Sequence, residues 1–419
     1  MESGAQDGIV VHISRRAADR IRAGHLWIYR SDIESTTGDD AGTGVSTVAD
    51  SRGKPLGTGL YSAASEIAVR IVSSHGGLTR SDYLAELRER LHAALALRRT
   101  LVPEAFAHDS GTNACRLFFA EADGLPGIVA DRYNGVVVLQ LLTQSTARDD
   151  VRGVLRDVLA AEPWAGIVLE RPDPRIRELE QLGPAPDAPL WQRDEAVAPQ
   201  TIFCINDLAF HFDATAGQKT GAFLDQRLNY AAAAPEAHGR ALDVCTYQGG
   251  FALHLARTCS RVTGVDASRT ALEVADRNLE LNRDQISAHV KWIEADAFEL
   301  LRDFADRAIG DPTARFDSIV LDPPAFAKSK RAAEGAMRGY KELNLRALKM
   351  LTPGGTLVTC SCSHHVSLAD FTEMLRSAAA DTGRRVQLIE SRGAAPDHPA
   401  ILTLPETTYL KCLVCRVTA

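Results

Sequence analysis

The sequence lacks any long run of apolar residues. No window approaches the ~20 consecutive apolar residues that a membrane-spanning helix needs, and residues 1–7 have neither the basic nor the apolar region of a signal peptide. Cysteine is sparse, with 8 in 419 residues, which is too few for a disulfide scaffold. We therefore expect a cytoplasmic protein with free thiols and no membrane partner.

An excess of positive charge is also missing. The formal net charge is -7 at pH 7, which argues against indiscriminate binding of nucleic acid and leaves any RNA contact to local basic patches. Between His12 and Arg30 a single acid, Asp19, accompanies the arginines Arg15, Arg16, Arg20, Arg22 and Arg30. This pattern is typical of an RNA-binding surface, and equally of an ordinary solvated helix.

Periodicity and composition predict three domains in a chain of this length. Residues 9–75 have short alternating runs around one helix, which predicts a small barrel-like β domain. Residues 80–196 open with an amphipathic helix and predict an α+β domain that closes with the proline-rich linker or hairpin arm 183–189. Residues 200–419 alternate strands with helices, which predicts a doubly wound α/β sheet with ligands at the carboxyl ends of its strands.

The dinucleotide fingerprint GxGxxG is absent from the first strand-to-helix junction of this last domain. The junction instead has Asp243 at the strand tip and the adjacent pair Gly249 and Gly250. It offers few backbone donors for a pyrophosphate, but its acid suits the charged amine of S-adenosylmethionine (SAM). An ordinary glycine-rich turn explains the same residues.

Two further acids follow the next two strands. Asp266 ends the second strand, where an acid characteristically binds the hydroxyls of a ribose. Asp296 follows the third strand and either approaches the adenine or caps the next helix. Together with Asp243, these acids predict a nucleoside-containing cofactor more specifically than any one of them alone.

The fourth strand ends in Asp322-Pro323-Pro324-Ala325-Phe326. Two prolines make this backbone rigid, and an acid with an aromatic ring suits a flipped nucleobase, which the acid can hydrogen-bond and the ring can stack on. Alternatively, Phe326 is a core residue behind a strand stopped by proline.

Two cysteines, Cys360 and Cys362, end the fifth strand. A thiolate there can add to carbon 6 of a pyrimidine and so activate carbon 5 toward methylation, provided that cationic groups or amide dipoles favour its ionised form. Both cysteines also fit the role of small buried hydrophobes. A four-thiolate metal site with Cys412 and Cys415 is disfavoured, because their spacing in a strand points them to opposite faces.

The loop 328–331 follows the Asp-Pro-Pro strand and forms a second basic patch with Arg338 and Lys341. It suits RNA phosphates as well as it suits a solvated loop.

These motifs resemble the bacterial 23S ribosomal RNA large subunit methyltransferase I family. The likeness runs nearly end to end and rests on the blocks at residues 20–29, 125–133, 219–227, 322–324, 361–363 and 397–399. It implies an N-terminal PUA domain, a central α+β domain and a C-terminal Rossmann-like, class I SAM-dependent methyltransferase domain. It further implies SAM as cofactor, 23S ribosomal RNA as partner and 5-methylcytosine as product. A homodimer is compatible with the sequence, but no residue predicts one.

The motifs and the resemblance together define a predicted site. Cys362 is the predicted nucleophile, because it fills the Ser-Cys-Ser position, and Asp322 is predicted to orient the cytosine and to favour protonation of its ring nitrogen. The predicted cofactor-binding residues are Phe223, Asp225, Arg227, Asp243, Tyr247, Gly249, Gly250, Phe251, Asp266, Ala267, Asp296, Ala297 and Asp322. The predicted substrate-binding residues are Pro323, Pro324, Phe326, Lys328, Arg338 and His398. No residue is predicted to bind a metal.

Three other functions stay open at this point. Asp-Pro-Pro followed by an aromatic residue also resembles motifs of nitrogen methylation, which needs no cysteine. A non-catalytic RNA-binding or ribosome-assembly factor would use only the PUA-like and basic segments. A nicotinamide-dependent oxidoreductase is disfavoured by the missing fingerprint.

Overall fold

The computed structural model describes residues 8–38, 43–171, 173–215, 222–326 and 333–418. The chain divides into two compact units. The first comprises residues 1–203, 212–221 and 396–407, and the second comprises residues 204–211, 222–395 and 408–419. None of the described helices is long and apolar enough to cross a membrane.

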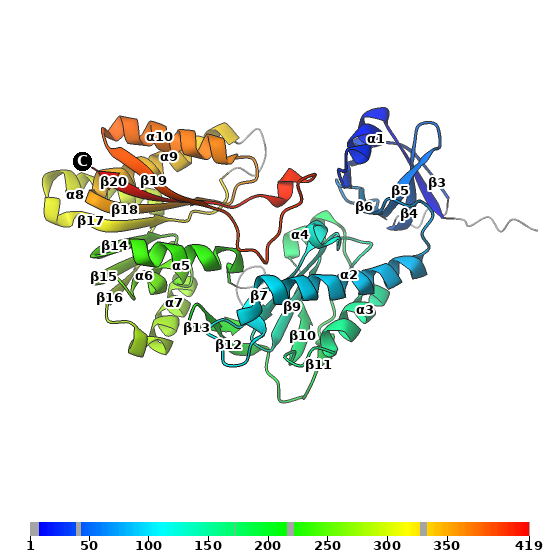
Figure 1. Ribbon diagram of the computed structural model, residues 1–419, viewed down its shortest axis with the longest axis horizontal. Helices are drawn as coiled ribbons and strands as arrows, with labels where there is room; N and C mark the ends of the chain where they lie inside the picture. The colour runs from blue at the N-terminus through cyan, green and yellow to red at the C-terminus, as the bar shows by residue number, and fades with distance from the viewer. Residues whose placement is uncertain (1–7, 39–42, 172, 216–221, 327–332, 419) are drawn as a thin grey trace, which may run out of the picture. The chain divides into compact units, whose positions relative to one another are not determined.

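The amino-terminal part of the first unit is a six-stranded sheet with one helix (Figure 1). Its elements in chain order are β1 (Ile9–Ile13), α1 (Arg15–Arg22), β2 (Trp27–Ile28), β3 (Ile33–Thr37), β4 (Thr43–Asp50), β5 (Pro55–Ser62) and β6 (Val69–Ser73). The strand order is β2-β6-β5-β4-β1-β3. Alternate residues of β1, such as Val11 and Ile13, are buried against Ala17 and Ala18 of α1, so one face of the sheet forms the core.

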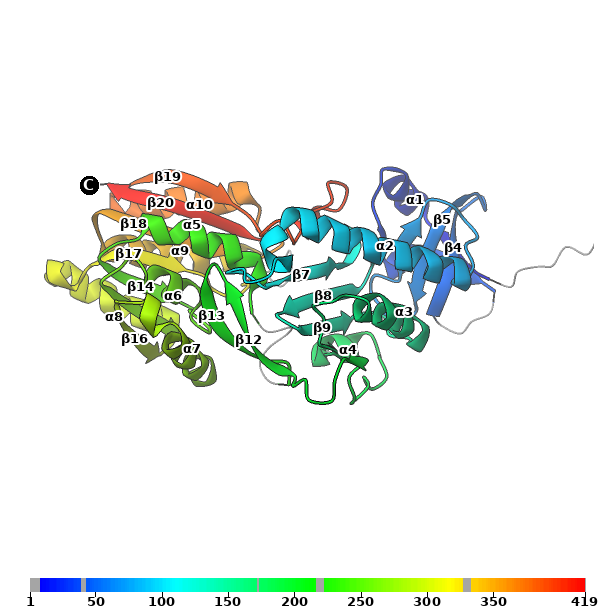
Figure 2. The same ribbon diagram turned by 60° about the horizontal axis from the view of Figure 1, so that its bottom comes forward.

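The rest of the first unit packs helices on a five-stranded sheet of order β11-β10-β9-β8-β7. Figure 2 shows helix α2 running beside β7 and β8. Thr79 and Asp82 form a capping box that starts α2 directly after the amino-terminal sheet. The elements are α2 (Arg80–Leu101), β7 (Ala114–Phe119), β8 (Ile128–Tyr133), β9 (Val136–Leu141), α3 (Asp149–Ala160), β10 (Ile167–Glu170), α4 (Pro174–Leu179) and β11 (Trp191–Gln192).

The second unit is built on a seven-stranded sheet of order β16-β15-β14-β17-β18-β20-β19. Its strands are β14 (Arg240–Val244), β15 (Arg261–Asp266), β16 (His289–Glu294), β17 (Phe316–Leu321), β18 (Leu351–Ser361), β19 (Arg385–Arg392) and β20 (Lys411–Thr418). The first five strands along the chain are parallel, and β20 runs antiparallel to both β18 and β19. A separate two-stranded sheet, β12 (Gln200–Ile205) and β13 (Leu208–Asp213), has residues in both units.

Helices cover both faces of the large sheet, as Figure 1 shows. They are α5 (Arg227–Glu236), α6 (Gly250–Leu255), α7 (Arg269–Leu281), α8 (Ala297–Gly310), α9 (Ala333–Met350) and α10 (Leu368–Thr382). Helices α8, α9 and α10 share one apolar core with β14, β17 and β18. Because the central strands are buried on both faces, the carboxyl ends of the parallel strands are where polar side chains reach solvent and ligands.

Candidate active site

Three predicted acids lie together at the carboxyl ends of neighbouring parallel strands. Strands β15, β14 and β17 are adjacent in the sheet. Asp266 ends β15, Asp243 is the penultimate residue of β14, and Asp322 directly follows β17. The fold therefore brings these acids to one edge, as the alternation of strands and helices predicts.

Asp243 is fully buried. Its Oδ2 accepts hydrogen bonds from the Thr246 hydroxyl at 2.5 Å and from the Ala252 amide at 2.8 Å. Its Oδ1 is buried and has no hydrogen-bond partner among the described residues. Burial raises the pKa of this carboxyl to about 7. A buried acceptor left without a donor is costly, so the site favours a ligand that brings one.

The loop after β14 has a strained backbone. Cys245 and Tyr247 have φ angles of 64° and 51°, in the left-handed region that residues other than glycine seldom adopt. A Cβ atom on Gly250 would lie 2.6 Å from the ring of Tyr230, so only glycine allows this packing. The loop directs the Tyr247 amide to Asp266 Oδ2 at 2.9 Å. Strain of this kind is typical of ligand-binding sites.

Asp266 and Asp296 differ in their remaining contacts. Asp266 Oδ1 accepts a hydrogen bond from the Ser268 amide at 2.8 Å. Asp296 is exposed and caps helix α8, where its Oδ1 accepts hydrogen bonds from the amides of Phe298 at 2.9 Å and Glu299 at 3.1 Å. The helix-capping alternative for Asp296 is therefore realised, and its contact with adenine stays a prediction.

The electrostatics of Cys245 show how closely the acids gather. Burial raises the pKa of this thiol, and the carboxylates of Asp266, Asp322, Asp243 and Asp296 raise it further. Cys245 therefore stays protonated, and all four acids lie close enough to this thiol to raise its pKa.

Asp322 is half-buried beside Gln226. Burial and the carboxylates of Asp225 and Asp243 raise its pKa to about 8. A hydrogen bond from the Gln226 side chain lowers the pKa, but by less than these effects raise it. Gln226 Oε1 accepts a 2.6 Å hydrogen bond from Asn229, so its amide nitrogen is the atom available to Asp322. At pH 7 Asp322 is therefore mainly a neutral acid that can donate a proton.

The Ser-Cys-Ser and Asp-Pro-Pro motifs lie side by side. Strand β18 is the parallel neighbour of β17, so the residues that follow these strands meet at the same edge. The Sγ atom of Cys362 is 4.0 Å from the carbonyl oxygen of Pro323. The half-buried thiol of Cys362 thus contacts the residue that directly follows Asp322 in the chain.

Lys411 is a buried lysine next to this thiol. It is 5% exposed and pairs in register with Ser361 across β18 and β20. Its Nζ donates hydrogen bonds to the carbonyl oxygens of Ser363 at 2.6 Å and Tyr409 at 2.7 Å. Burial lowers the pKa of Lys411 to about 8, and the nearby Cys362 raises it. An ammonium group therefore lies close enough to Cys362 to favour its thiolate.

The environment of Cys360, unlike that of Cys362, disfavours a thiolate. Cys360 is fully buried and lies in register with Cys412. Burial and Cys412 raise its pKa well above the ordinary value, so it stays a thiol. In the part of the chain that the structure describes, no cluster of His, Cys, Asp and Glu could hold a metal ion.

Four of the residues predicted to bind the cofactor differ in their contacts. Phe223 and Tyr247 are in edge-to-face contact, with ring centres 5.1 Å apart. Asp225 accepts a 2.6 Å hydrogen bond from the Tyr409 hydroxyl. Arg227, by contrast, is buried at the start of α5. Their contacts with the cofactor stay predictions.

The other predicted cofactor residues differ in exposure. Phe251 is buried edge-on against Tyr230, at 4.7 Å between ring centres. Ala267 is exposed directly after β15, and Ala297 is half-buried at the start of α8.

Phe326 packs against the core rather than standing free. Its ring centre is 4.8 Å from that of Tyr340, whose hydroxyl is 2.8 Å from the Ser363 hydroxyl. Pro324 is exposed, whereas Pro323 is buried. The core alternative for Phe326 is thus partly realised, and base stacking stays a prediction.

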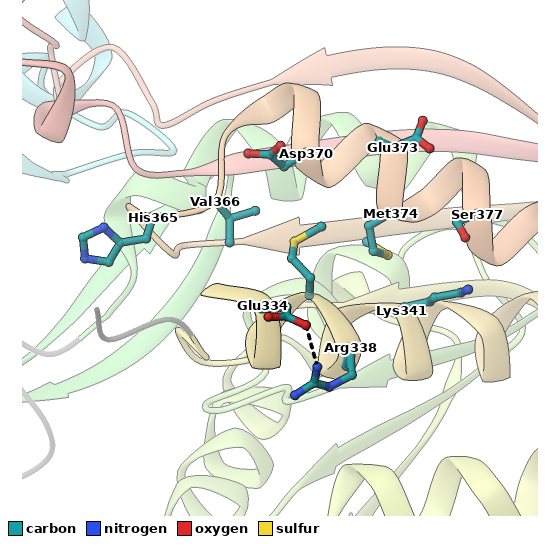
Figure 3. Close-up of a pocket in the computed structure, with 10 residues that line it drawn as sticks. Glu334, Arg338, Lys341, His365, Val366, Asp370, Glu373, Met374 and Ser377 are labelled. Carbon is teal, nitrogen blue, oxygen red and sulfur yellow. Dashed lines mark hydrogen bonds and ion pairs between the residues drawn. The ribbon is translucent and has the colours of Figure 1, made fainter. Parts of the chain in front are cut away.

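The second basic patch is largely neutralised where it is described. Arg338 lines a groove of about 620 Å³ between α9 and α10, where it pairs with Glu334 at 3.2 Å (Figure 3). Lys341 lines the same groove and pairs with Asp381 at 2.7 Å. Lys328 lies outside the described residues.

The amino-terminal patch and His398 belong to the first unit. Arg20 and Arg22 pair with Asp32 and Asp50, which reduces the positive charge of that patch. His398 is buried, with its ring centre 5.3 Å from that of Phe119. Its role in substrate binding stays a prediction.

Comparison with known proteins agrees with this geometry. A sequence profile of S-adenosylmethionine-dependent methyltransferases matches residues 116–416, and a profile of PUA-like domains matches residues 11–74. Two relatives named ribosomal RNA large subunit methyltransferase I match 94% of this chain and 95% of their own length. The protein of Shewanella denitrificans is 38% identical over 398 residues, and that of Citrobacter koseri is 35% identical over 395 residues. The chain belongs to this methyltransferase I family.

Family membership confirms the resemblance drawn from the sequence, the predicted fold class and SAM as the cofactor. A provisionally named SAM-dependent methyltransferase of Streptococcus mutans shares the fold at 18% identity, with a TM-score of 0.79 over 97% of this chain and 99% of that one. The boundaries predicted for the three domains stay predictions.

The sheet edge fits SAM. The buried Asp243 Oδ1 needs a donor, and the amine of SAM is one. Asp266 lies at the strand end where an acid meets ribose hydroxyls. When bound, SAM supplies an electrophilic methyl group.

Sequence reasoning does not identify Gln226 or Lys411. Gln226 lies inside the distinctive block 219–227, and Lys411 interrupts the apolar run 409–415. A lysine within an otherwise buried strand is the signal that could have pointed to it.

Proposed function

We propose that the protein methylates carbon 5 of a cytosine in 23S ribosomal RNA, in the cytoplasm, through a covalent adduct of Cys362. The relatives named above act, by their names, on ribosomal RNA of the large subunit. The observation that carries the proposal is the 4.0 Å contact of the Cys362 thiol with Pro323 of the Asp-Pro-Pro motif.

In this mechanism the Cys362 thiolate adds to carbon 6 of the cytosine while Asp322 gives a proton to ring nitrogen 3. The ring then has enamine character at carbon 5, which becomes the nucleophile for the methyl group. Water then accepts the carbon-5 proton, and the electrons of that bond form the carbon 5–carbon 6 double bond and expel the Cys362 thiolate. Nitrogen 3 returns its proton to the Asp322 carboxylate, which leaves neutral 5-methylcytosine. Asp322 suits the first step because its pKa, raised to about 8 by burial and by Asp225 and Asp243, keeps it protonated at pH 7.

We expect Lys411 to act on the reaction through Cys362. Removing the ammonium in Lys411→Met should raise the pKa of the Cys362 thiol by about one unit or more, because Lys411 and Cys362 interact electrostatically and a nearby cation favours the ionised form. The rate of Cys362 alkylation by iodoacetamide, followed by peptide mass spectrometry across pH 6 to 10, measures this shift.

Lys411→Arg is the matched control, because it keeps the positive charge. It should leave the alkylation profile closer to that of the wild type than Lys411→Met does. Identical profiles for wild type and Lys411→Met would show that Lys411 is only structural.

Nucleoside analysis by mass spectrometry tests the proposed reaction. A strain that lacks the gene should lose one 5-methylcytosine from its 23S ribosomal RNA, and the wild-type gene should restore it. An unchanged 5-methylcytosine content with a missing methylguanine or methyladenine would instead support nitrogen methylation. Unchanged methylation throughout would support a non-catalytic RNA-binding role.

A further inference from the structure

A row of basic residues crosses the amino ends of three neighbouring parallel strands. Arg240 opens β14, Arg261 opens β15 and His289 opens β16, and the register places Arg261 opposite both of the others. Neighbouring strands are about 4.8 Å apart. Like charges directly opposite one another destabilise a sheet, so a row of this kind favours a bound anion.

The row lines a groove of about 820 Å³. Lys291 and Arg307 add two more basic side chains, and none of the lining residues is acidic. Part of the lining is apolar and includes Phe304 and Phe316. We call this feature, with its five residues Arg240, Arg261, His289, Lys291 and Arg307, the cationic groove.

Little within the protein balances this charge. Among the residues that the structure describes, Arg261, Lys291 and Arg307 form no ion pair. Arg240 donates a 2.6 Å hydrogen bond to the carbonyl oxygen of Thr313 and lies 4.8 Å from the ring centre of Phe316. These contacts orient its guanidinium group, and the nearby carboxylate of Asp311 offsets part of its charge. The unbalanced charge therefore lies mainly on Arg261, Lys291 and Arg307.

The cationic groove stands out against the rest of the protein. The chain carries a net charge of -7, so an uncompensated cluster of cations is not a general property of its surface. In the two basic patches that the sequence suggests, Arg22 pairs with Asp50 and Arg338 pairs with Glu334. The cationic groove is therefore a stronger candidate for an anion site than either of them.

We propose that the cationic groove binds the phosphodiester backbone of the RNA substrate. The proposal rests on ribosomal RNA being that substrate. Backbone phosphates suit the groove because arginine and lysine recognise them without reading the base sequence. The groove lies at the amino ends of strands of five and six residues, whose other ends carry Asp243 and Asp266. At ~3.3 Å per residue, Arg240 is thus about 10 Å from Asp243 along β14, and Arg261 is about 17 Å from Asp266 along β15, so the RNA must extend beyond the target nucleotide.

Charge reversal in the full-length protein tests this. The double variant Arg261→Glu/Lys291→Glu should bind a deproteinised 23S ribosomal RNA transcript at least tenfold more weakly than the wild type in filter binding. The slope of log Kd against log salt should decrease by about 1.5, because two phosphate contacts at ~0.7 to 0.9 each are lost. The neutral pair Lys291→Gln/Arg307→Gln should act in the same direction with a smaller effect.

Arg302→Glu/Arg385→Glu is the matched control. Both residues are exposed and outside the cationic groove, Arg302 is on α8 like Arg307, and the change in net charge is the same. This control should weaken binding less than threefold. All variants should keep the wild-type affinity for SAM and the wild-type Tm, which separates loss of RNA binding from loss of the fold.

The measurement needs no turnover, so it is independent of whether Cys362 is the nucleophile. Equal RNA affinities and salt slopes for the groove variant and the control would overturn the proposal. Unchanged binding to deproteinised RNA with lost binding to ribosomal particles would overturn it as well, in favour of an acidic protein partner.

Discussion

Cys362→Ala is expected to lower the rate of cytosine methylation at least about 10⁴-fold, because it removes the nucleophile from a mechanism that depends on a covalent adduct. The affinity for SAM should stay unchanged, because Asp243 and Asp266, which are predicted to bind the cofactor, lie on β14 and β15 and not on β18. Single-turnover transfer of a labelled methyl group to a 23S ribosomal RNA transcript measures the rate, and calorimetric titration measures the affinity.

Trapping of the covalent adduct tests directly whether Cys362 is the nucleophile. RNA that carries 5-fluorocytosine at the target should form a stable covalent complex with the wild-type protein, because fluorine cannot leave carbon 5 as a proton does. Cys362→Ala should form none.

The matched control is Cys360→Ala, two residues earlier on β18. Cys360 is fully buried beside Cys412, so its loss should cost about 1 to 2 kcal/mol of folding stability and leave both methylation and trapping intact. Loss of activity in Cys360→Ala with full activity in Cys362→Ala would contradict the assignment of the nucleophile.

The parallel strands of the second unit, and the edge at which their polar residues meet, could be predicted from the sequence. Each buried strand ends at or next to a polar residue, such as Asp243, Asp266 or Asp322, and local periodicity alone places these residues at the same edge. The proximity of Cys362 to the Asp-Pro-Pro segment follows from the same rule, because β17 and β18 are parallel neighbours.

Contacts between segments distant in sequence could not be predicted in this way. Lys411 reaches Cys362 because β20 returns antiparallel beside β18, a pairing that local patterns do not encode. Gln226 reaches Asp322 from a segment that precedes the first strand of the sheet. The ionisation of Asp322 was equally hidden, because it depends on burial and on Asp225 and Asp243.

Asp322→Asn is expected to reduce kcat by about 10² to 10⁴-fold, the range for loss of a general acid. Asparagine has the shape of the neutral carboxyl group and can still donate a hydrogen bond, but it has no proton to transfer. The KM for RNA should therefore change little. Steady-state kinetics with the 23S transcript separates the two quantities. Asp303→Asn, at an exposed residue of α8 outside the predicted site, is the matched control and should change kcat less than threefold.

The pH dependence of the methylation rate of the wild-type protein also tests whether Asp322 is the general acid. Because the folded-state pKa of Asp322 is raised to about 8, the proton is present below that pH and is lost as the pH rises through it. The wild-type rate should therefore fall above pH 8, even though the Cys362 thiolate becomes more abundant there.

Lys411, whose pKa is also about 8, loses its charge over the same range. For this reason the comparison must include Lys411→Arg, which stays charged and should keep the fall if Asp322 causes it. A rate that keeps rising to pH 10 in this variant, or an Asp322→Asn variant with normal kcat and weakened SAM binding, would make Asp322 a cofactor ligand rather than the acid.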